Sequence, residues 1–173
     1  FGAEASNNLV VLPPEANVHG LLDVGVATEG GADPLEGAAA VLLIRDDPTM
    51  RLATAGAALA KAATVIVIDN VLSEAAKAAA VVIAEGRAYA STGTYTTADH
   101  RIQKLMPAVK PEGDAVSLFE ALSALGAALG VELPKTADAA LGAIAKLDSA
   151  YQPAWDLIIG EGVRRAVAVS SKV

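Results

Sequence analysis

The stretch Thr64-Val-Ile-Val-Ile-Asp69 decides the fold class of this chain. It is a continuous apolar run of strand length bounded by polar residues, which is typical of a strand covered on both faces in a parallel sheet. Further β-rich runs lie at about residues 8–12, 39–44 and 81–83. The first ends at Pro13-Pro14, because proline cannot donate a hydrogen bond to a sheet ladder. We therefore expect a mainly parallel sheet of about four strands.

Helix signals lie between these runs. Asp46-Asp47-Pro48 combines an acidic cap with a proline near the first helical position, so it predicts a helix that continues over Met50–Ala63. Ser73-Glu74 opens a second helix, which extends through Ala80. Strands that alternate with helices of this kind imply βαβ units with right-handed crossovers. We expect an α/β fold, a three-layer αβα sandwich, up to about residue 85.

The periodicity changes in the later part of the chain. Residues 85–110 show no clear period and are expected to form a long ordered loop. Ser117-Leu-Phe-Glu120 is a capping box, which predicts an amphipathic helix over residues 118–129. Two further helices are expected over residues 137–147 and 152–167. The expected domains are an α/β domain at residues 1–110 and a helical C-terminal segment at residues 111–173 that packs on it.

The composition argues against several kinds of site. Aromatic residues make up only 3% of the chain, so its core must be built from small aliphatic side chains. The net charge of −7 and the lack of a basic cluster longer than Arg164-Arg165 argue against a nucleic-acid partner. The absence of cysteine excludes disulfides and thiolate-bound iron–sulfur or zinc sites within these residues. Two histidines are too few to predict a metal site, and no apolar run reaches the ~18 residues typical of a membrane span.

Two polar clusters are candidate binding residues, and each has a structural explanation as well. Asn17, Gly20 and Asp23 follow the proline turn. Glycine lets the backbone approach a ligand closely, while Asn and Asp offer hydrogen bonds; a helical turn capped by its own side chains explains the same residues. Asp69 ends a parallel strand, at the edge of the sheet where ligands bind in open α/β folds. Strand termination by Asp69 and helix capping by Ser73 explain that segment too.

The order and spacing of these segments resemble the second half of the molybdopterin oxidoreductase domain. The resemblance covers roughly residues 8–130 and includes Gly93-Thr-Tyr-Thr-Thr-Ala-Asp-His-Arg-Ile-Gln103. The most similar form of the domain is the one built into the bacterial proton-pumping NADH–quinone oxidoreductase (complex I, or NADH dehydrogenase I), within the single subunit that carries such a domain. The resemblance implies that a pterin-binding face, vestigial here, is formed by Asn17, Gly20, Asp23, Asp69 and Arg101.

Several positions that are polar or proline in cofactor-bearing relatives are changed in this chain. Ala80, Ala84 and Ala90 stand where that pattern has Asp, Pro and Glu, and Thr97 and His100 replace Asn and Arg. Buried polar groups cost ~1–3 kcal/mol each when no partner satisfies them. Their loss is what a site without its cofactor should show. The resemblance therefore implies that no cofactor is bound in this segment.

Three functional hypotheses follow. The first is a non-catalytic scaffold domain of that complex I subunit, with no catalytic or metal-binding residue here and with iron–sulfur clusters in a missing upstream part. Its partners would be the remaining domains of the same polypeptide and neighbouring peripheral-arm subunits, on the cytoplasmic side of the cell membrane. The second is half of a catalytic molybdopterin guanine dinucleotide enzyme, similar to formate dehydrogenase. The third is a stand-alone flavodoxin-like binding module, against which the missing Gly-x-Gly-x-x-Gly fingerprint counts.

The first residues, Phe1-Gly2-Ala3, precede an expected strand by only a few positions, without a basic region ahead of an apolar run. We therefore expect no signal peptide here, and we expect the chain to be a piece of a larger protein.

Overall fold

The computed structural model describes residues 12–13, 15–26, 33–156 and 163–164. Contacts between residues group the chain into two compact units. Unit 1 comprises residues 1–27, 92–106 and 137–173, and unit 2 comprises residues 28–91 and 107–136. Both units are assembled from separate stretches of the sequence. The division of family domains near residue 110 stays a prediction.

Unit 2 is built on a parallel sheet, which confirms the expected α/β class. Its strands are β1 (Ala40–Ile44), β2 (Thr64–Asp69) and β3 (Val81–Ala84), in the order β1-β2-β3. The register places Leu43 beside Val67, and Val67 beside Val82. The described sheet has three strands rather than about four. Most of the strand expected at residues 8–12 lies outside the described residues.

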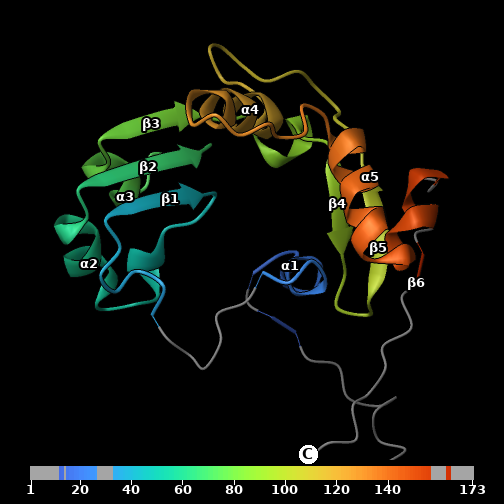
Figure 1. Cartoon of the computed structure of the whole chain (residues 1–173), viewed down its shortest axis with the longest axis horizontal. Helices are drawn as coiled ribbons and strands as arrows, with labels where there is room; N and C mark the ends of the chain where they lie inside the picture. Colours follow the sequence, from blue (N-terminus) through green and yellow to red (C-terminus); the bar gives the residue numbers. More distant parts are fainter. Residues whose placement is uncertain (1–11, 14, 27–32, 157–162, 165–173) are drawn as a thin grey trace, which may run out of the picture. The chain divides into compact units, whose positions relative to one another are not determined.

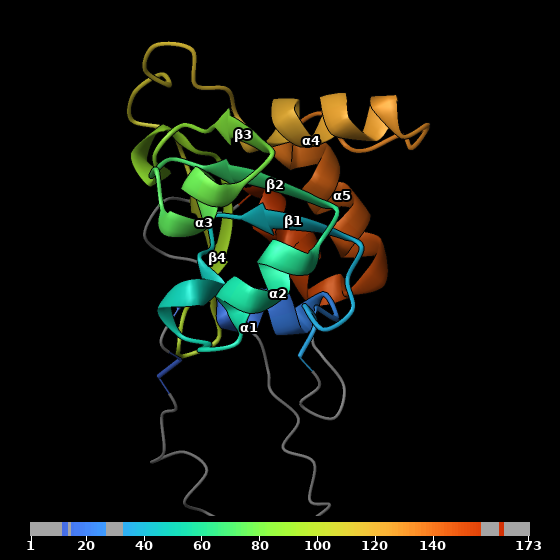
Figure 2. The same cartoon turned by 90° about the vertical axis from the view of Figure 1, so that its left-hand side faces the viewer.

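Two short helices carry the chain between these strands. α2 (Ala55–Lys61) leads into β2, and α3 (Glu74–Ala78) leads into β3. Both helices lie on the same face of the sheet (Figures 1 and 2). The helix expected from Met50 begins only at Ala55. A 3-10 turn, η3 (Pro48–Met50), comes first, and Arg51 then leaves the helical conformation with φ −130°.

The core of unit 2 lies between the sheet and these helices. Its members are small aliphatic side chains, as the low aromatic content predicts: Leu35, Val41, Leu43, Ala55, Leu59, Val65, Val67, Ala75 and Ala76. Alanine on both helices allows their backbones to approach the strands closely. Val67 in the central strand is fully buried. The alternating pattern of β1 instead leaves Leu42 40% exposed and Ile44 37% exposed.

A longer helix, α4 (Leu118–Ala128), completes unit 2 and confirms the predicted capping box. The backbone N–H of Glu120 donates to Ser117 Oγ over 3.2 Å, and the N–H of Ser117 donates to Glu120 Oε2 over 2.8 Å. These bonds lower the pKa of Glu120, the backbone N–H of Ser117 being the main cause. Near the end of α4 only glycine fits at position 126, because a Cβ there would lie 2.8 Å from the carbonyl oxygen of Val131.

Unit 1 contains an antiparallel sheet that the sequence did not predict. β4 (Gly93–Thr96), β5 (Arg101–Leu105) and β6 (Val163–Arg164) lie in the order β4-β5-β6. The expectation of a loop over residues 85–110 was therefore wrong, although a 3-10 turn, η4 (Ala88–Ala90), precedes the hairpin in unit 2. Both strands of the hairpin are short and polar. In β5 a single fully buried residue, Ile102, supplies the apolar anchor.

Three helical elements accompany this sheet. They are α1 (Val18–Asp23), α5 (Ala137–Leu147) and a 3-10 segment, η5 (Ser149–Asp156). α5 has the predicted bounds, and Leu141 on it packs with Ile102 and Tyr151. The helix expected over residues 152–167 was wrong in its described parts, because η5 ends at Asp156 and residues 163–164 pair with β5. None of the described helices is long and apolar enough to cross a membrane.

Asp47 is the cap that joins two elements of unit 2. Its Oδ1 accepts hydrogen bonds from the N–H and the hydroxyl of Thr49, at 3.0 and 2.6 Å, and its Oδ2 accepts one from the N–H of Ala75 at 3.3 Å. We predict that Asp47→Ala lowers the free energy of unfolding by about 1 kcal/mol, as loss of an N-cap does. Urea denaturation followed by circular dichroism measures this. The neighbouring Asp46→Ala, which removes an exposed ion pair with Arg51, should cost less than about 1 kcal/mol.

The same cap predicts a pH dependence. The hydrogen bond from the Thr49 hydroxyl is the main cause that lowers the pKa of Asp47 from its ordinary value of 3.8. A carboxyl group with a lowered folded-state pKa stabilises the fold above its ordinary pKa, and this contribution is lost as the pH falls through the folded value. The stability difference between the native chain and Asp47→Asn should therefore be present at neutral pH and shrink below pH 3.8. A difference that persists unchanged in acid would contradict it.

Candidate functional site at the carboxyl edge of the sheet

The candidate site lies where the three parallel strands of unit 2 end. Arg45 follows β1, Asp69 ends β2 and Glu85 follows β3, so parallel pairing brings these three residues to one edge. Two backbone hydrogen bonds extend the ladder across them. The N–H of Arg45 donates to the carbonyl of Ile68 over 2.9 Å, and the N–H of Glu85 donates to that of Asp69 over 3.0 Å. Ligands bind at this edge in open α/β sheets.

A buried ion pair occupies the edge. Arg45 Nε donates to Glu85 Oε2 over 2.6 Å, and Arg45 Nη2 donates to Oε1 of the same carboxylate and to Ser91 Oγ, the latter over 2.6 Å. The side chain of Glu85 is 1% exposed and that of Arg45 is 27% exposed. Arg45 adopts a left-handed backbone conformation with φ 51°. The guanidinium group thus neutralises a carboxylate that would otherwise be buried with its charge unpaired.

Asp69 serves the local backbone. Its Oδ1 accepts hydrogen bonds from the N–H groups of Asn70 and Val71, at 2.7 and 3.3 Å, so the side chain closes the turn after β2. Ser73 then caps α3, as expected, by accepting a hydrogen bond from the N–H of Ala76 over 3.2 Å. These bonds are the ones that the structural explanation of this segment requires.

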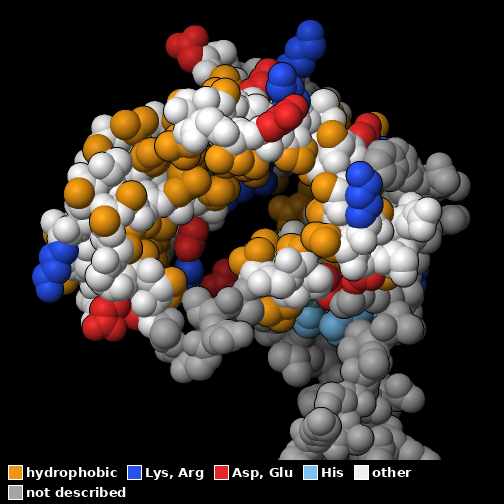
Figure 3. Space-filling view, viewed as in Figure 1, with side chains coloured by type: hydrophobic (Ala, Val, Ile, Leu, Met, Phe, Trp, Pro, Cys, Tyr) orange, Lys and Arg blue, Asp and Glu red, His pale blue; other side chains and the backbone are white. Residues whose placement is uncertain are grey.

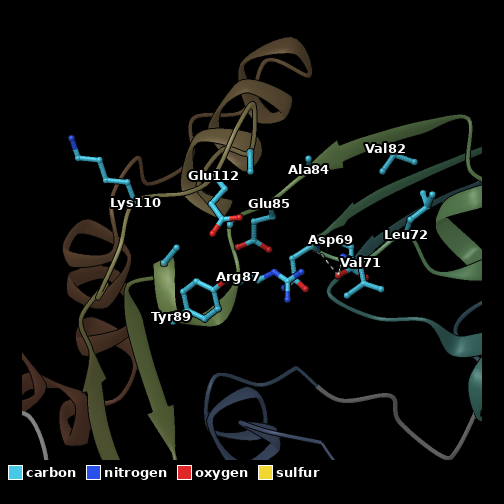
Figure 4. Close-up of a pocket in the computed structure, with 14 residues that line it drawn as sticks. Asp69, Val71, Leu72, Val82, Ala84, Glu85, Arg87, Tyr89, Lys110 and Glu112 are labelled. Carbon is cyan, nitrogen blue, oxygen red and sulfur yellow. Dashed lines mark hydrogen bonds between the residues drawn. The ribbon is translucent and has the colours of Figure 1, made fainter.

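A cavity of about 290 Å³ opens at the same edge (Figure 4). Its apolar lining includes Val71 and Tyr89, which are 60% and 49% exposed. Its charged lining residues are Asp69, Glu85, Arg87, Lys110 and Glu112. Figure 4 shows the side chain of Lys110 directed away from the other residues drawn. Ala84 and Ala90, two of the positions at which alanine replaces other residues of the family pattern, also line the cavity.

Unit 1 brings together three of the other residues that the sequence singled out. Asn17 Oδ1 accepts a hydrogen bond from the N–H of Thr96 over 2.9 Å. Gly20 leaves the space that the Asn17 side chain fills, because a Cβ at position 20 would overlap it. Asp23 Oδ2 accepts a hydrogen bond from the Tyr151 hydroxyl over 2.9 Å, and that hydroxyl lies 3.0 Å from Thr96 Oγ1. Asn17 and Asp23 therefore dock α1 onto β4 and η5.

Arg101, the remaining residue of the expected pterin face, lies at the start of β5. Its Nε is 3.7 Å from Asp99 Oδ2, which is a partly exposed ion pair. Asp69 belongs to unit 2, whereas the other four expected residues belong to unit 1. Within the described residues, no group of three or more His, Cys, Asp and Glu side chains is arranged to hold a metal ion.

Sequence reasoning missed two groups that organise these sites. Arg45 and Glu85 each follow a strand directly, so a charge at a strand end was the available signal, but their separation of forty residues hid the pairing. Tyr151 is 2% exposed and its hydroxyl joins two partners in unit 1. The sequence around Tyr151 gave no sign of this contact.

We predict that Arg45→Ala lowers the free energy of unfolding by about 3 kcal/mol, because it leaves the Glu85 carboxylate buried without its cation. The double variant Arg45→Met/Glu85→Leu removes both charges and should recover most of that loss. Arg51→Ala is the matched control, since it breaks an exposed arginine–carboxylate pair. Urea denaturation of the native chain and these variants measures the differences. Equal losses for Arg45→Ala and Arg51→Ala would show that the buried pair contributes nothing particular.

Comparison with known proteins gives one positive finding. Residues 2–128 match the family model described as molybdopterin oxidoreductase. No curated protein matches the chain significantly. Because the family model covers well over half of the sequence, the chain belongs to the molybdopterin oxidoreductase family.

Proposed function

We propose that this member of the molybdopterin oxidoreductase family is a scaffold domain of the kind found in NADH–quinone oxidoreductase, and that it works without a pterin cofactor. The observation that carries the proposal is the bonding of the expected pterin face. Its polar side chains bond to the chain's own backbone and side chains. A domain of this type holds neighbouring parts of a protein complex in place and takes no part in the redox chemistry itself.

The residues that would hold a pterin are engaged elsewhere. Asn17 and Asp23 are bonded to Thr96 and Tyr151, and Asp69 closes its own turn. The close approach that glycine allows at position 20 is taken up by the side chain of Asn17. These residues therefore do not fit a pterin in the arrangement they adopt, and we assign no reaction step to such a group.

The sheet edge in unit 2 supports the same proposal. A cofactor-binding edge needs polar groups directed at the ligand, but here Arg45 and Glu85 neutralise each other. The positions at which the cofactor-bearing pattern has Pro and Glu are Ala84 and Ala90, and both line the cavity with methyl groups. Alanine offers a ligand no side-chain hydrogen bond. The cavity is thus poorly equipped to hold a polar ring system.

Under this proposal the electron carriers lie outside this segment. Iron–sulfur clusters need cysteine ligands, which this sequence lacks. They would belong to an upstream part of the same polypeptide. The partners of the segment would be the remaining domains of that polypeptide and adjoining peripheral-arm subunits, and its place would be the cytoplasmic side of the cell membrane. Asp69, Glu74, His100 and Arg101 would carry no proton in the reaction.

One observation favours a second candidate, a catalytic molybdopterin guanine dinucleotide enzyme similar to formate dehydrogenase. The cavity at the sheet edge lies where α/β folds bind nucleotides, and Arg87 in its lining carries a positive charge. A stand-alone flavodoxin-like module has less support, since no glycine fingerprint follows a strand.

Metal analysis of the complete gene product that contains this chain separates the first two candidates. The protein should be purified natively and assayed for molybdenum and tungsten by mass spectrometry, with iron measured in the same sample as a control for cofactor retention. We expect iron without stoichiometric molybdenum or tungsten. One molybdenum or tungsten atom per polypeptide would overturn the scaffold proposal in favour of the catalytic one.

A substitution series tests the scaffold role directly in the assembled complex. Asp69→Ala removes the turn contact after β2, so it should lower the yield of assembled complex while NADH oxidation per assembled complex is unchanged. Asp114→Ala, at an exposed position of the same unit, is the matched control and should alter neither quantity. If Asp69→Ala assembles normally but loses turnover, the residue takes part in chemistry and the proposal is wrong.

A further inference from the structure

The two histidines of this chain meet in unit 1, although eighty-one positions separate them in sequence. His19 lies on α1, and His100 lies in the turn between β4 and β5. Their ring centroids are 4.3 Å apart and their planes are tilted by 56°. Figure 3 shows the pair as adjoining pale-blue side chains. His100 holds its position in a left-handed backbone conformation with φ 57°.

One nitrogen of each ring is buried without a partner. His19 Nε2 and His100 Nδ1 are shielded from solvent, and neither has a hydrogen-bond partner within the part of the chain that the structure describes. A buried polar atom without a partner costs free energy, and such atoms are rare in folded proteins. Two of them on rings in mutual contact call for a common explanation. A single bound atom that both nitrogens can ligate would satisfy both.

We propose that His19 and His100 together bind one divalent transition-metal ion, of the class to which Zn²⁺ belongs. Neutral imidazole nitrogen is the commonest protein ligand for such ions. With zinc–nitrogen bonds of about 2.0–2.1 Å, two imidazoles on neighbouring positions of one ion have centroids roughly 4.5–5.3 Å apart. The observed separation of 4.3 Å is slightly smaller, so a small opening of the rings admits the ion.

The nearby carboxylates indicate that the protein supplies two ligands. Asp23 lies one helical turn after His19 but accepts a hydrogen bond from the Tyr151 hydroxyl. Asp99 precedes His100 but accepts one from the Thr97 hydroxyl and faces Arg101. Water therefore completes the coordination. Such a site exchanges its ion readily, favours Zn²⁺, Ni²⁺ and Cu²⁺, and discriminates against the oxygen-seeking ions Mg²⁺ and Ca²⁺.

The ion would act as a staple between two segments of unit 1. α1 has six residues, and a helix of that length is not stable without tertiary contacts. A metal ion bound to His19 and His100 would tie α1 to the β4–β5 turn, beside the hydrogen bond from the Thr96 N–H to Asn17. Because the folded chain alone assembles the pair, the stabilisation of the folded state should grow with the concentration of free ion.

The sequence simplifies the test, since the chain has two histidines and no cysteine. The full chain should be labelled with ¹⁵N in its histidine rings and titrated with ZnCl₂ at about pH 7.5, while the ring nitrogen resonances are followed by NMR. We expect both rings to shift together and to saturate at one zinc per chain. MgCl₂ at the same concentrations should shift neither. Lowering the pH to about 5.5 should weaken zinc binding, because protons compete for imidazole nitrogen.

Variants identify the ligands. His19→Ala and His100→Ala should each weaken zinc binding at least about tenfold in calorimetric titrations, and each should abolish the rise in melting temperature that zinc causes in the native chain. Glu36→Ala, at an exposed carboxylate in unit 2, should change neither. If a variant does not fold, the titration of the native chain still decides. Independent shifts of the two rings, a shift of one ring alone, or no shift would each overturn the proposal.

Discussion

The buried ion pair between Arg45 and Glu85 is the constraint around which unit 2 is organised. A carboxylate that is 1% exposed is tolerated only beside a cation and further hydrogen bonds. Parallel pairing supplies the geometry, because it places the residues after β1 and β3 at one edge. The backbone around Glu85 adds to the closure. The N–H of Gly86 donates to the carbonyl of Val116, and the N–H of Val116 donates to that of Ala84, which binds the segment leading into α4 to the sheet.

This closure uses the polar groups that an open α/β sheet otherwise directs at a ligand. The same kind of bonding is found in unit 1, where Asn17 and Asp23 fix α1 through Thr96 and Tyr151. In both units the candidate binding residues have found partners within the chain. Family membership alone does not decide whether a member binds its cofactor, since the fold is compatible with both states. The hydrogen bonds of the individual side chains are more informative on this point than the fold.

How much the sequence predicted depended on the range of the interaction. The apolar run ending at Asp69 predicted β2 correctly, and the capping box at Ser117 placed the start of α4, because both signals are local. The β4–β5 hairpin was missed because its strands are short and polar, and a single residue, Ile102, anchors the second of them. Arg45 was missed as a site residue since its partner lies forty positions away. Pairings of this kind follow from tertiary packing, which a linear pattern does not encode.

The candidate site was predicted in its residues more successfully than in its arrangement. The sequence named Asp69 together with Asn17, but Asp69 belongs to unit 2 and Asn17 to unit 1. The missing polar groups at Ala84 and Ala90 and the engaged polar groups at the pterin face are independent observations, since one is a change of residue and the other a pattern of bonding. Both reduce the number of groups that a ligand can reach. A domain retained for binding would be expected to lose such groups last, so their loss favours retention of this domain for its shape and for what it holds together.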